Sequence, residues 1–349
     1  MTKEVLFDIN QNGTATITLN RPQAINSLTH NMLTKIRKKL TSWKNDDRIQ
    51  VIILQGAGSR GLCAGGDMKA LYDIKNSEGT LQEARNFFDV EYETDLLVYE
   101  YPKPIVASLD GIVMGGGVGL SYGATHRIVT EKTKWSMPEM NIGFFPDVGA
   151  AYFLNRAPGY IGRYLALNAK VLPASDVLSI GGADHYMPQE KLNKLLEEIQ
   201  ATNWHETNPK ENLTELIDSF VEKSESTSEN LAEFQEKIDQ HFNYDTVEEI
   251  IASLDSDSSD FAQNTKENML SKSPVSLKVT LKQLKKGEGK SFAECLSLDL
   301  TIATNFMKHH DFYEGVRSVL VDKDQNPDYD YKQLSDVSDE MVESFFTKN

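Results

Sequence analysis

The chain has 349 residues, of which 40% are hydrophobic and 25% charged, as is typical of a globular protein with a sizeable core. Its formal net charge of −16 argues against a nucleic-acid binder or a membrane-surface protein, because both usually need a basic face. Two cysteines, Cys63 and Cys295, are too few for a disulfide framework and predict a cytoplasmic location. The sequence shows no signal-peptide pattern and no apolar run as long as a membrane span.

Strand and helix patterns alternate along the first part of the chain. Residues 5–10 and 14–20 predict a hairpin across Gln11-Asn-Gly13. Thr29 is the predicted N-cap of a helix whose apolar face holds Met32, Ile36 and Leu40. Unbroken apolar runs predict buried strands over 51–55 and 105–109, and a long helix is predicted over 81–99.

Two glycine clusters each precede a predicted helix. Gly65-Gly66 leads into a helix from Asp67, and Gly115-Gly116-Gly117 leads into a small-residue helix over 118–124. Such turns expose backbone N–H groups, and a helix N-terminus favours negative charge. Neither cluster fits a dinucleotide loop or a Walker phosphate loop. The glycines could serve close packing alone, but two clusters in one domain favour an oxyanion hole, which needs two converging N–H donors.

Several carboxylates lie in apolar surroundings. Glu139 and Asp147 flank a segment rich in Met, Ile and Phe, where a carboxylate is costly unless it is paired, protonated or used. Asp147 could instead cap a helix that starts near Val148. Glu91, in the helix over 81–99, could instead lie on a solvated face.

Other chemical classes find no support. His126 and His185 look isolated and no Cys/His set exists, so we predict no metal. Ser121 and Ser136 lack a G-x-S-x-G context, which argues against a serine hydrolase. We expect Cys63 to pack under the first glycine turn.

The later part of the chain is mostly helical. Ser273 is the expected cap of a closing helical region, and Ser/Glu-rich residues 223–229 predict an exposed linker. We expect an α/β core with the active site over residues 1–190 and a mainly helical region over residues 191–349. The helical patterns cover 150–168 with a break at 157–159, 174–180, 192–270, 277–284 and 292–307.

Several segments together resemble the crotonase (enoyl-CoA hydratase/isomerase) superfamily, and within it the 3-hydroxyisobutyryl-CoA hydrolase branch. The matching segments are distributed along most of the chain: 20–28 (NRPQAINSL), 63–68 (CAGGDM), 110–120 (DGIVMGGGVGL), 137–147 (MPEMNIGFFPD), 273–278 (SPVSLK) and 310–325 (HDFYEGVRSVLVDKDQ).

The resemblance implies an α/β fold, a crotonase-like spiral of repeated ββα units followed by a mainly helical C-terminal region. It implies an acyl-CoA thioester whose carbonyl oxygen is held by the N–H groups of Gly66 and Gly116. Glu139 matches one of two glutamates of family hydratases, but the other falls at Gly119, which has no side chain. Hydrolase relatives carry an acid eight positions after the glutamate, matched by Asp147, and a substrate-contacting glutamate, matched by Glu91.

These matches favour an acyl-CoA thioester hydrolase that cleaves 3-hydroxyisobutyryl-CoA, or a similar short 3-hydroxyacyl-CoA, in valine breakdown. The alternatives are an enoyl-CoA hydratase or isomerase and a non-catalytic acyl-CoA-binding protein. No cofactor is implied, since coenzyme A is part of the substrate. Arg21 and Lys69 are candidates for holding its phosphates, or are simply solvated surface charges. The expected partner is the small-molecule substrate, with no nucleic acid or membrane, and a homo-oligomer is compatible with the resemblance.

Overall fold

The computed structural model describes residues 3–76, 80–206, 208–224 and 231–348. The chain divides into two compact units, each built from three separate segments. Unit 1 comprises Met1–Gly66, Val90–Ser136 and Leu172–Ser228. Unit 2 comprises Asp67–Asp89, Met137–Val171 and Glu229–Asn349. The expected boundary near residue 190 stays a prediction.

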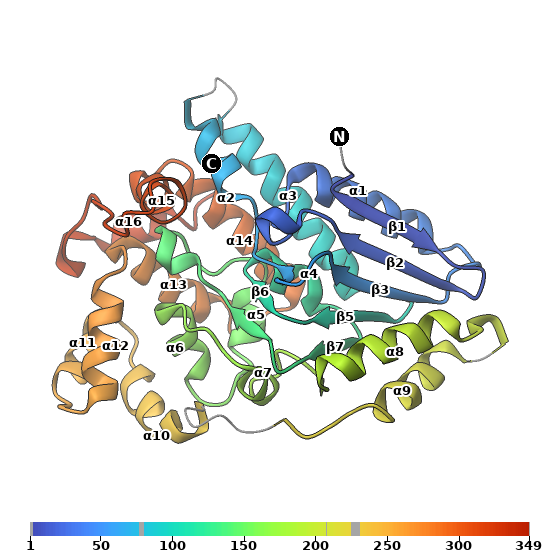
Figure 1. Cartoon of the computed structure of the whole chain (residues 1–349). Helices are drawn as coiled ribbons and strands as arrows, with labels where there is room; N and C mark the ends of the chain where they lie inside the picture. The colour runs from blue at the N-terminus through green and yellow to red at the C-terminus, as the bar shows by residue number, and fades with distance from the viewer. Residues whose placement is uncertain (1–2, 77–79, 207, 225–230, 349) are drawn as a thin grey trace. The chain divides into compact units, whose positions relative to one another are not determined.

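A six-stranded sheet with the order β1-β2-β3-β5-β7-β9 forms the centre of unit 1 (Figure 1). β1 and β2 pair antiparallel as the predicted hairpin, and the other neighbours pair in parallel. The predicted buried strands are present because their apolar runs are covered on both faces. The strands are β1 (Val5–Ile9), β2 (Thr14–Leu19), β3 (Val51–Gly56), β5 (Ile105–Leu109), β7 (His126–Val129) and β9 (His185–Tyr186).

A second, three-stranded parallel sheet also lies in unit 1, in the order β4-β6-β8. Its strands are β4 (Gly61–Cys63), β6 (Ile112–Met114) and β8 (Lys134–Ser136). The sequence did not predict them, because three residues are too few to show an alternating pattern. This small sheet matters for the site, since β4 and β6 lead into the two glycine clusters.

Helices α1, α8 and α9 of unit 1 pack apolar faces on the large sheet, whereas α4 contacts β4 and β6 of the small sheet. Thr29 caps α1 by accepting a hydrogen bond from Met32 N–H, as predicted, and the apolar face of α1 is buried. Residues of α8 and α9 share a buried core with β3, β5 and β7 (Figure 1). The helices are α1 (His30–Trp43), α4 (Gly116–Tyr122), α7 (Ala174–Ser179), α8 (Gln189–Ala201) and α9 (Pro209–Asp218). α3 (Thr80–Tyr99) contributes residues 90–99 to unit 1 and residues 80–89 to unit 2.

Unit 2 is helical in its described residues and is centred on aromatic side chains. The ring of Phe144 contacts those of Phe88, Phe306 and Phe312. Ser273 caps α13, as predicted. Its α-helices, with the 3-10 helix that carries Glu139, are α2 (Met68–Asp73), η3 (Glu139–Ile142), α5 (Ala150–Leu154), α6 (Ile161–Asn168), α10 (Leu231–Phe242), α11 (Val247–Asp255), α12 (Asp260–Leu270), α13 (Pro274–Gly287), α14 (Phe292–Phe306), α15 (His310–Val316) and α16 (Asp339–Ser344).

Three sequence predictions concern what the chain lacks or leaves open. Residues 225–229, most of the linker predicted over 223–229, lie outside the described residues. Across the described ranges, none of the helices combines the length and the apolar character of a membrane span. The same ranges contain no cluster of three or more His, Cys, Asp or Glu side chains suited to a metal ion.

Candidate active site

Both glycine clusters of unit 1 follow strands of the three-stranded sheet. β4 and β6 are parallel neighbours, so Gly65-Gly66 and Gly115-Gly116 follow the same edge of that sheet. Gly65 has φ +109° and Gly115 has φ +48°, conformations that a residue with a Cβ rarely adopts. Leu28 N–H donates to Gly65 O over 2.8 Å, and Gly115 N–H donates to Ser136 O over 3.1 Å. Both turns are therefore fixed by backbone bonds to neighbouring segments.

Gly116 brings three of the predicted residues together. A Cβ at Gly116 would lie 2.3 Å from Glu91 Oε1 and 3.2 Å from Gly66 N. Gly116 is the first residue of α4, which begins two residues before the helix predicted over 118–124. The first N–H groups of a helix have no acceptor within that helix, and they carry partial positive charge. The N–H groups of Gly66 and Gly116 are thus near neighbours beside a carboxylate.

Glu91 is a buried side chain, not a solvated one. It is 1% exposed, whereas Glu93 on the opposite side of the helix is exposed and pairs with Arg37. The solvated alternative for Glu91 is therefore wrong. Asp95, one turn further along α3, is also buried.

Cys63 packs under the first glycine turn, as expected. Its Sγ lies 3.3 Å from Gly65 N, and a Cβ at Gly117 would come within 2.7 Å of Cys63 Cβ. Burial raises the pKa of the Cys63 thiol to about 12, and the charges of Glu91 and Asp95 contribute to the rise. This thiol is a packing group and not a nucleophile.

Glu139 and Asp147 lie in unit 2 and are both buried, at 3% and 1% exposed. Glu139 is the first residue of η3, and among the described residues its Oε2 has no hydrogen-bond partner. Burial raises the pKa of Glu139 well above its usual value, and the charge of Asp147 raises it further. The two acids are therefore electrostatic neighbours, and their protonation is coupled.

Asp147 does not cap the helix that follows it. α5 begins at Ala150, and its N-cap is Gly149 with φ +82°. The N-cap alternative is therefore wrong. Val148, between Asp147 and Gly149, has φ +51°, which is unfavourable for a β-branched residue. Strained backbone of this kind is concentrated at functional sites.

The two basic candidates differ in their surroundings. Arg21 Nη1 donates to Ser27 O over 2.8 Å, and Arg21 Nε lies 3.6 Å from Glu4 Oε1. These contacts occupy Arg21 in local structure. Lys69 is exposed on α2. A role for either residue in holding phosphate stays a prediction.

Two features of the structure were not found from the sequence. Asp299 and Gln283, both fully buried, bond to each other and to the turn that carries Asp147. The position of Asp299 within the apolar run SLDLTI was the sequence signal that could have indicated a buried acid. His126 and His185 are also not isolated, since His126 Nδ1 lies 3.3 Å from His185 Nε2. The parallel pairing of β7 with β9 brings them together across 59 residues.

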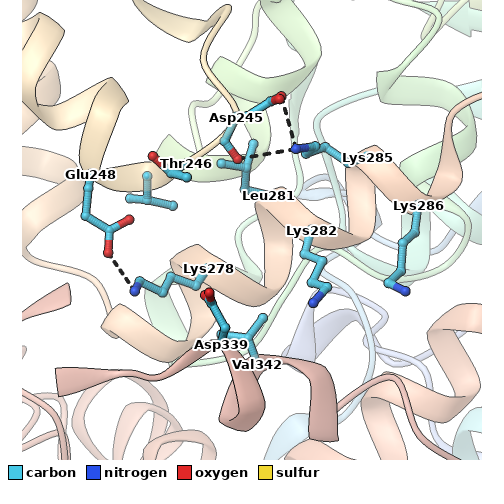
Figure 2. Close-up of a pocket in the computed structure, with 11 residues that line it drawn as sticks. Asp245, Thr246, Glu248, Lys278, Leu281, Lys282, Lys285, Lys286, Asp339 and Val342 are labelled. Atoms are coloured by element: carbon cyan, nitrogen blue, oxygen red, sulfur yellow. Dashed lines mark hydrogen bonds and ion pairs between the residues drawn. The ribbon is translucent and has the colours of Figure 1, made fainter. Parts of the chain in front are cut away.

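A cavity of about 460 Å³ in unit 2 contains none of the predicted site residues (Figure 2). Lys278, Lys282, Lys285 and Lys286 of α13 line it, and Figure 2 shows Lys278 paired with Glu248 and Lys285 with Asp245. Gln283 and Thr280 lie on another face of α13, where they bond to Pro146 O and Met140 Sδ. The buried acids, and not this cavity, therefore mark the candidate site in unit 2.

Comparison with known proteins gives consistent matches. A family model described as enoyl-CoA hydratase/isomerase matches residues 14–346. The chain is 41% identical over 334 residues to a protein of Xenopus laevis named 3-hydroxyisobutyryl-CoA hydrolase, mitochondrial, covering 95% of this chain and 86% of that protein.

Two solved structures align over nearly all of the chain. A carnitinyl-CoA dehydratase from Mycobacterium thermoresistibile has a TM-score of 0.91 and 36% identity, covering 100% of this chain and 97% of its own. An enoyl-CoA hydratase from Rhodobacter sphaeroides 2.4.1 has a TM-score of 0.87 and 31% identity, covering 99% of this chain and 97% of its own.

Proposed function

Because this chain belongs to the enoyl-CoA hydratase/isomerase (crotonase) family, we propose that it hydrolyses the thioester of a short 3-hydroxyacyl-CoA, namely 3-hydroxyisobutyryl-CoA. The chain is an acyl-CoA enzyme of this family, and its crotonase-like α/β fold with a helical C-terminal region is confirmed by the two solved structures. The choice of reaction and of acyl group is the proposal. It follows the name of the Xenopus laevis relative and the residues of the site.

The observation that carries the proposal is the buried pair Glu139 and Asp147, combined with glycine at position 119. Gly119 is a buried residue of α4, and because glycine has no side chain this position supplies no acid. Family hydratases add water to a double bond with two glutamates, and this chain has only the one at position 139. Hydrolysis needs one carboxylate that attacks or activates water, and a neighbouring acid that controls its proton.

The proposed reaction begins at the thioester carbonyl. The N–H groups of Gly66 and Gly116 stabilise the negative charge that develops on its oxygen, and loss of one such donor typically lowers the rate about 10²- to 10³-fold. Glu139 acts as nucleophile or as general base. In the first route its carboxylate displaces the thiolate, which takes up a proton, and water cleaves the resulting mixed anhydride. In the second route Glu139 accepts a proton from water as the water attacks the carbonyl carbon.

Asp147 and Glu91 have supporting roles in this proposal. Asp147 positions the water or Glu139 and shares a proton with it, consistent with the raised pKa of Glu139. Glu91, buried beside Gly116, accepts a hydrogen bond from the 3-hydroxyl of the acyl group. Arg21 and Lys69 remain candidates for the phosphates of coenzyme A. The predicted cytoplasmic location stays a prediction, because the name of the Xenopus laevis relative places that protein in mitochondria.

The test measures free thiol released from 3-hydroxyisobutyryl-CoA alongside hydration of crotonyl-CoA. We expect thiol release by the wild-type protein and a fall of at least about 10²-fold in kcat for Glu139→Gln and Asp147→Asn. Glu93→Gln is the matched control, since Glu93 is exposed and lies in α3 two residues from Glu91. Glu139→Gln with full thiol release would overturn the mechanism.

The other outcomes identify the alternatives. Hydration of crotonyl-CoA without thiol release would favour a hydratase that draws its second acid from another residue. Binding of the acyl-CoA with neither activity would favour the binding-protein alternative. After a single turnover in H₂¹⁸O, label in the Glu139 carboxylate would identify the anhydride route, because water then attacks the anhydride at its Glu139 carbon, whereas direct attack on the thioester places the label only in the product.

A further inference from the structure

The turn that carries Asp147 adopts an unfavourable backbone and needs to be held in place. Val148 and Gly149 have φ +51° and +82°, so two consecutive residues after Asp147 are in the left-handed region. Val148 is β-branched and fully buried, and such a residue rarely adopts this conformation unless its surroundings impose it. Without such support, the turn would relax and the carboxylate of Asp147 would move with it.

Two buried side chains supply that support from distant helices. Asp299 Oδ2 in α14 accepts a hydrogen bond from Gly149 N–H over 2.8 Å. Gln283 Nε2 in α13 donates to Pro146 O over 2.8 Å and to Asp299 Oδ1 over 2.8 Å. Asp147 lies between the two anchored backbone groups, Pro146 O and Gly149 N–H. A Cβ at Gly149 would also lie 2.2 Å from the ring of Phe292, so α14 packs against the turn at a second point.

The chemistry of the pair argues that it serves the site and not stability. Asp299 and Gln283 are both 0% exposed, and burying a carboxyl group in apolar surroundings is costly. Burial raises the pKa of Asp299 well above its usual value, the bond from Gly149 N–H opposes that rise, and the charge of Asp147 adds to it. An apolar pair would pack in the same space without this penalty, but it would leave Pro146 O and Gly149 N–H without these partners.

We propose that Asp299, together with Gln283, is a positioning residue for the reaction: the two side chains hold the turn over residues 146–149 and thereby fix the direction of the Asp147 carboxylate. The inference rests on the proposed function, since it takes Asp147 to be catalytic. Asp299 acts through Asp147 and does not itself touch the substrate. A displacement of about 1 Å in a catalytic group can lower a rate by about 10²-fold.

The test is a cycle of variants measured by thiol release. Asp299→Asn keeps an acceptor for Gly149 N–H but places an amide N–H₂ against Gln283 Nε2 or, in its other orientation, against Gly149 N–H. We expect kcat to fall at least 10-fold with KM changed less than 2-fold, and the pH dependence of kcat to shift. In the Asp147→Asn background, Asp299→Asn should lower kcat less than 2-fold further, because the group that it positions is already gone.

Controls separate positioning from general damage. Thr304→Ala is the matched control, because Thr304 lies in α14 and its hydroxyl donates to Leu300 O of the same helix. Gln283→Leu is the second variant and should reproduce the loss in kcat if Asp299→Asn fails to fold. Equal losses of kcat in the wild-type and Asp147→Asn backgrounds, or no loss in either, would overturn the inference.

A further readout works without activity. Hydrogen exchange at Gly149 N–H should be at least 10-fold faster in Gln283→Leu and in Asp299→Leu than in Thr304→Ala. If the wild-type protein releases no thiol but exchange at Gly149 accelerates as expected, the proposed function fails while the support of the turn stands. If the wild-type protein is active and exchange at Gly149 is unchanged, the positioning role fails while the proposed function stands.

Discussion

The contact between Gly116 and Glu91 gives a sharp test of the site geometry. Replacing Gly116 by Ala would place a Cβ 2.3 Å from Glu91 Oε1, against about 3.4 Å for an ordinary contact. The buried carboxylate would have to move by about 1 Å, and overpacking of this kind typically costs about 1–3 kcal/mol of folding stability. The same movement would take Glu91 away from its proposed position on the substrate.

The cost should disappear when the carboxylate is removed. In a double-mutant cycle with Glu91→Ala, Gly116→Ala should therefore show a favourable coupling of about 1–3 kcal/mol, measured by urea unfolding. Gly117→Ala is the matched control: its Cβ would lie 2.7 Å from Cys63 Cβ and 2.8 Å from Cys63 O, contacts that Glu91→Ala does not relieve.

Two results would refute this reasoning. One is additivity of Gly116→Ala and Glu91→Ala within about 0.5 kcal/mol, since neighbouring side chains that clash must couple. The other is an equal coupling for Gly117→Ala, which would show that Glu91→Ala loosens the whole region and not the contact with Gly116.

Three further predictions follow from burial. The pKa of Glu139 is raised in the folded state, so its contribution to folding stability is complete below about pH 4.3 and is lost as the pH rises through the folded-state pKa. Glu139→Gln should therefore be more stable than the wild type at pH 8, as measured by urea unfolding. Parallel stability curves for the two proteins would contradict this. Burial, aided by His185, lowers the pKa of His126, so stability should fall as pH drops below about 6.5, and His126→Gln should reduce that fall in thermal unfolding. Burial raises the pKa values of Cys63 and Cys295 to about 12 and about 11, so a thiol reagent at pH 8 should label neither in the folded protein and both in urea; rapid labelling of the folded protein would count against the buried positions.

The parts of the fold that were predicted correctly depend on local signals. Thr29 and the apolar face behind it specify α1 within one stretch of chain, and the apolar run at Ile105–Leu109 coincides with β5. The break between α5 and α6 follows from Pro158 and Gly159, the latter at φ +53°. Each of these features is determined by residues a few positions apart, so the pattern alone was sufficient.

The features that were missed depend on residues distant in the sequence. β6 and β8 are each three residues long and are defined by pairing with each other, with Ile112 opposite Lys134. No local sequence pattern indicates this pairing. Asp299 bonds to Gly149, 150 residues away in the sequence, and the sequence around a single acid in an apolar helix does not indicate which distant group it contacts.

The placement of the acids, together with glycine at position 119, is consistent with the proposed hydrolysis. A hydratase divides acid and base work between two carboxylates, and each must act on a different atom of the double bond. Glu139 and Asp147 are instead eight positions apart in unit 2, and the charge of Asp147 raises the pKa of Glu139. Because the charge of Asp147 raises the pKa of Glu139, the protonation of the two acids is coupled, and a coupled pair can take up a proton and later release it. The general-base route of the proposed hydrolysis needs that order, because Glu139 takes up a proton from the attacking water and later passes it to the departing thiolate. In the nucleophilic route Glu139 has no proton to give, and the thiolate takes its proton from a neighbouring acid or from water.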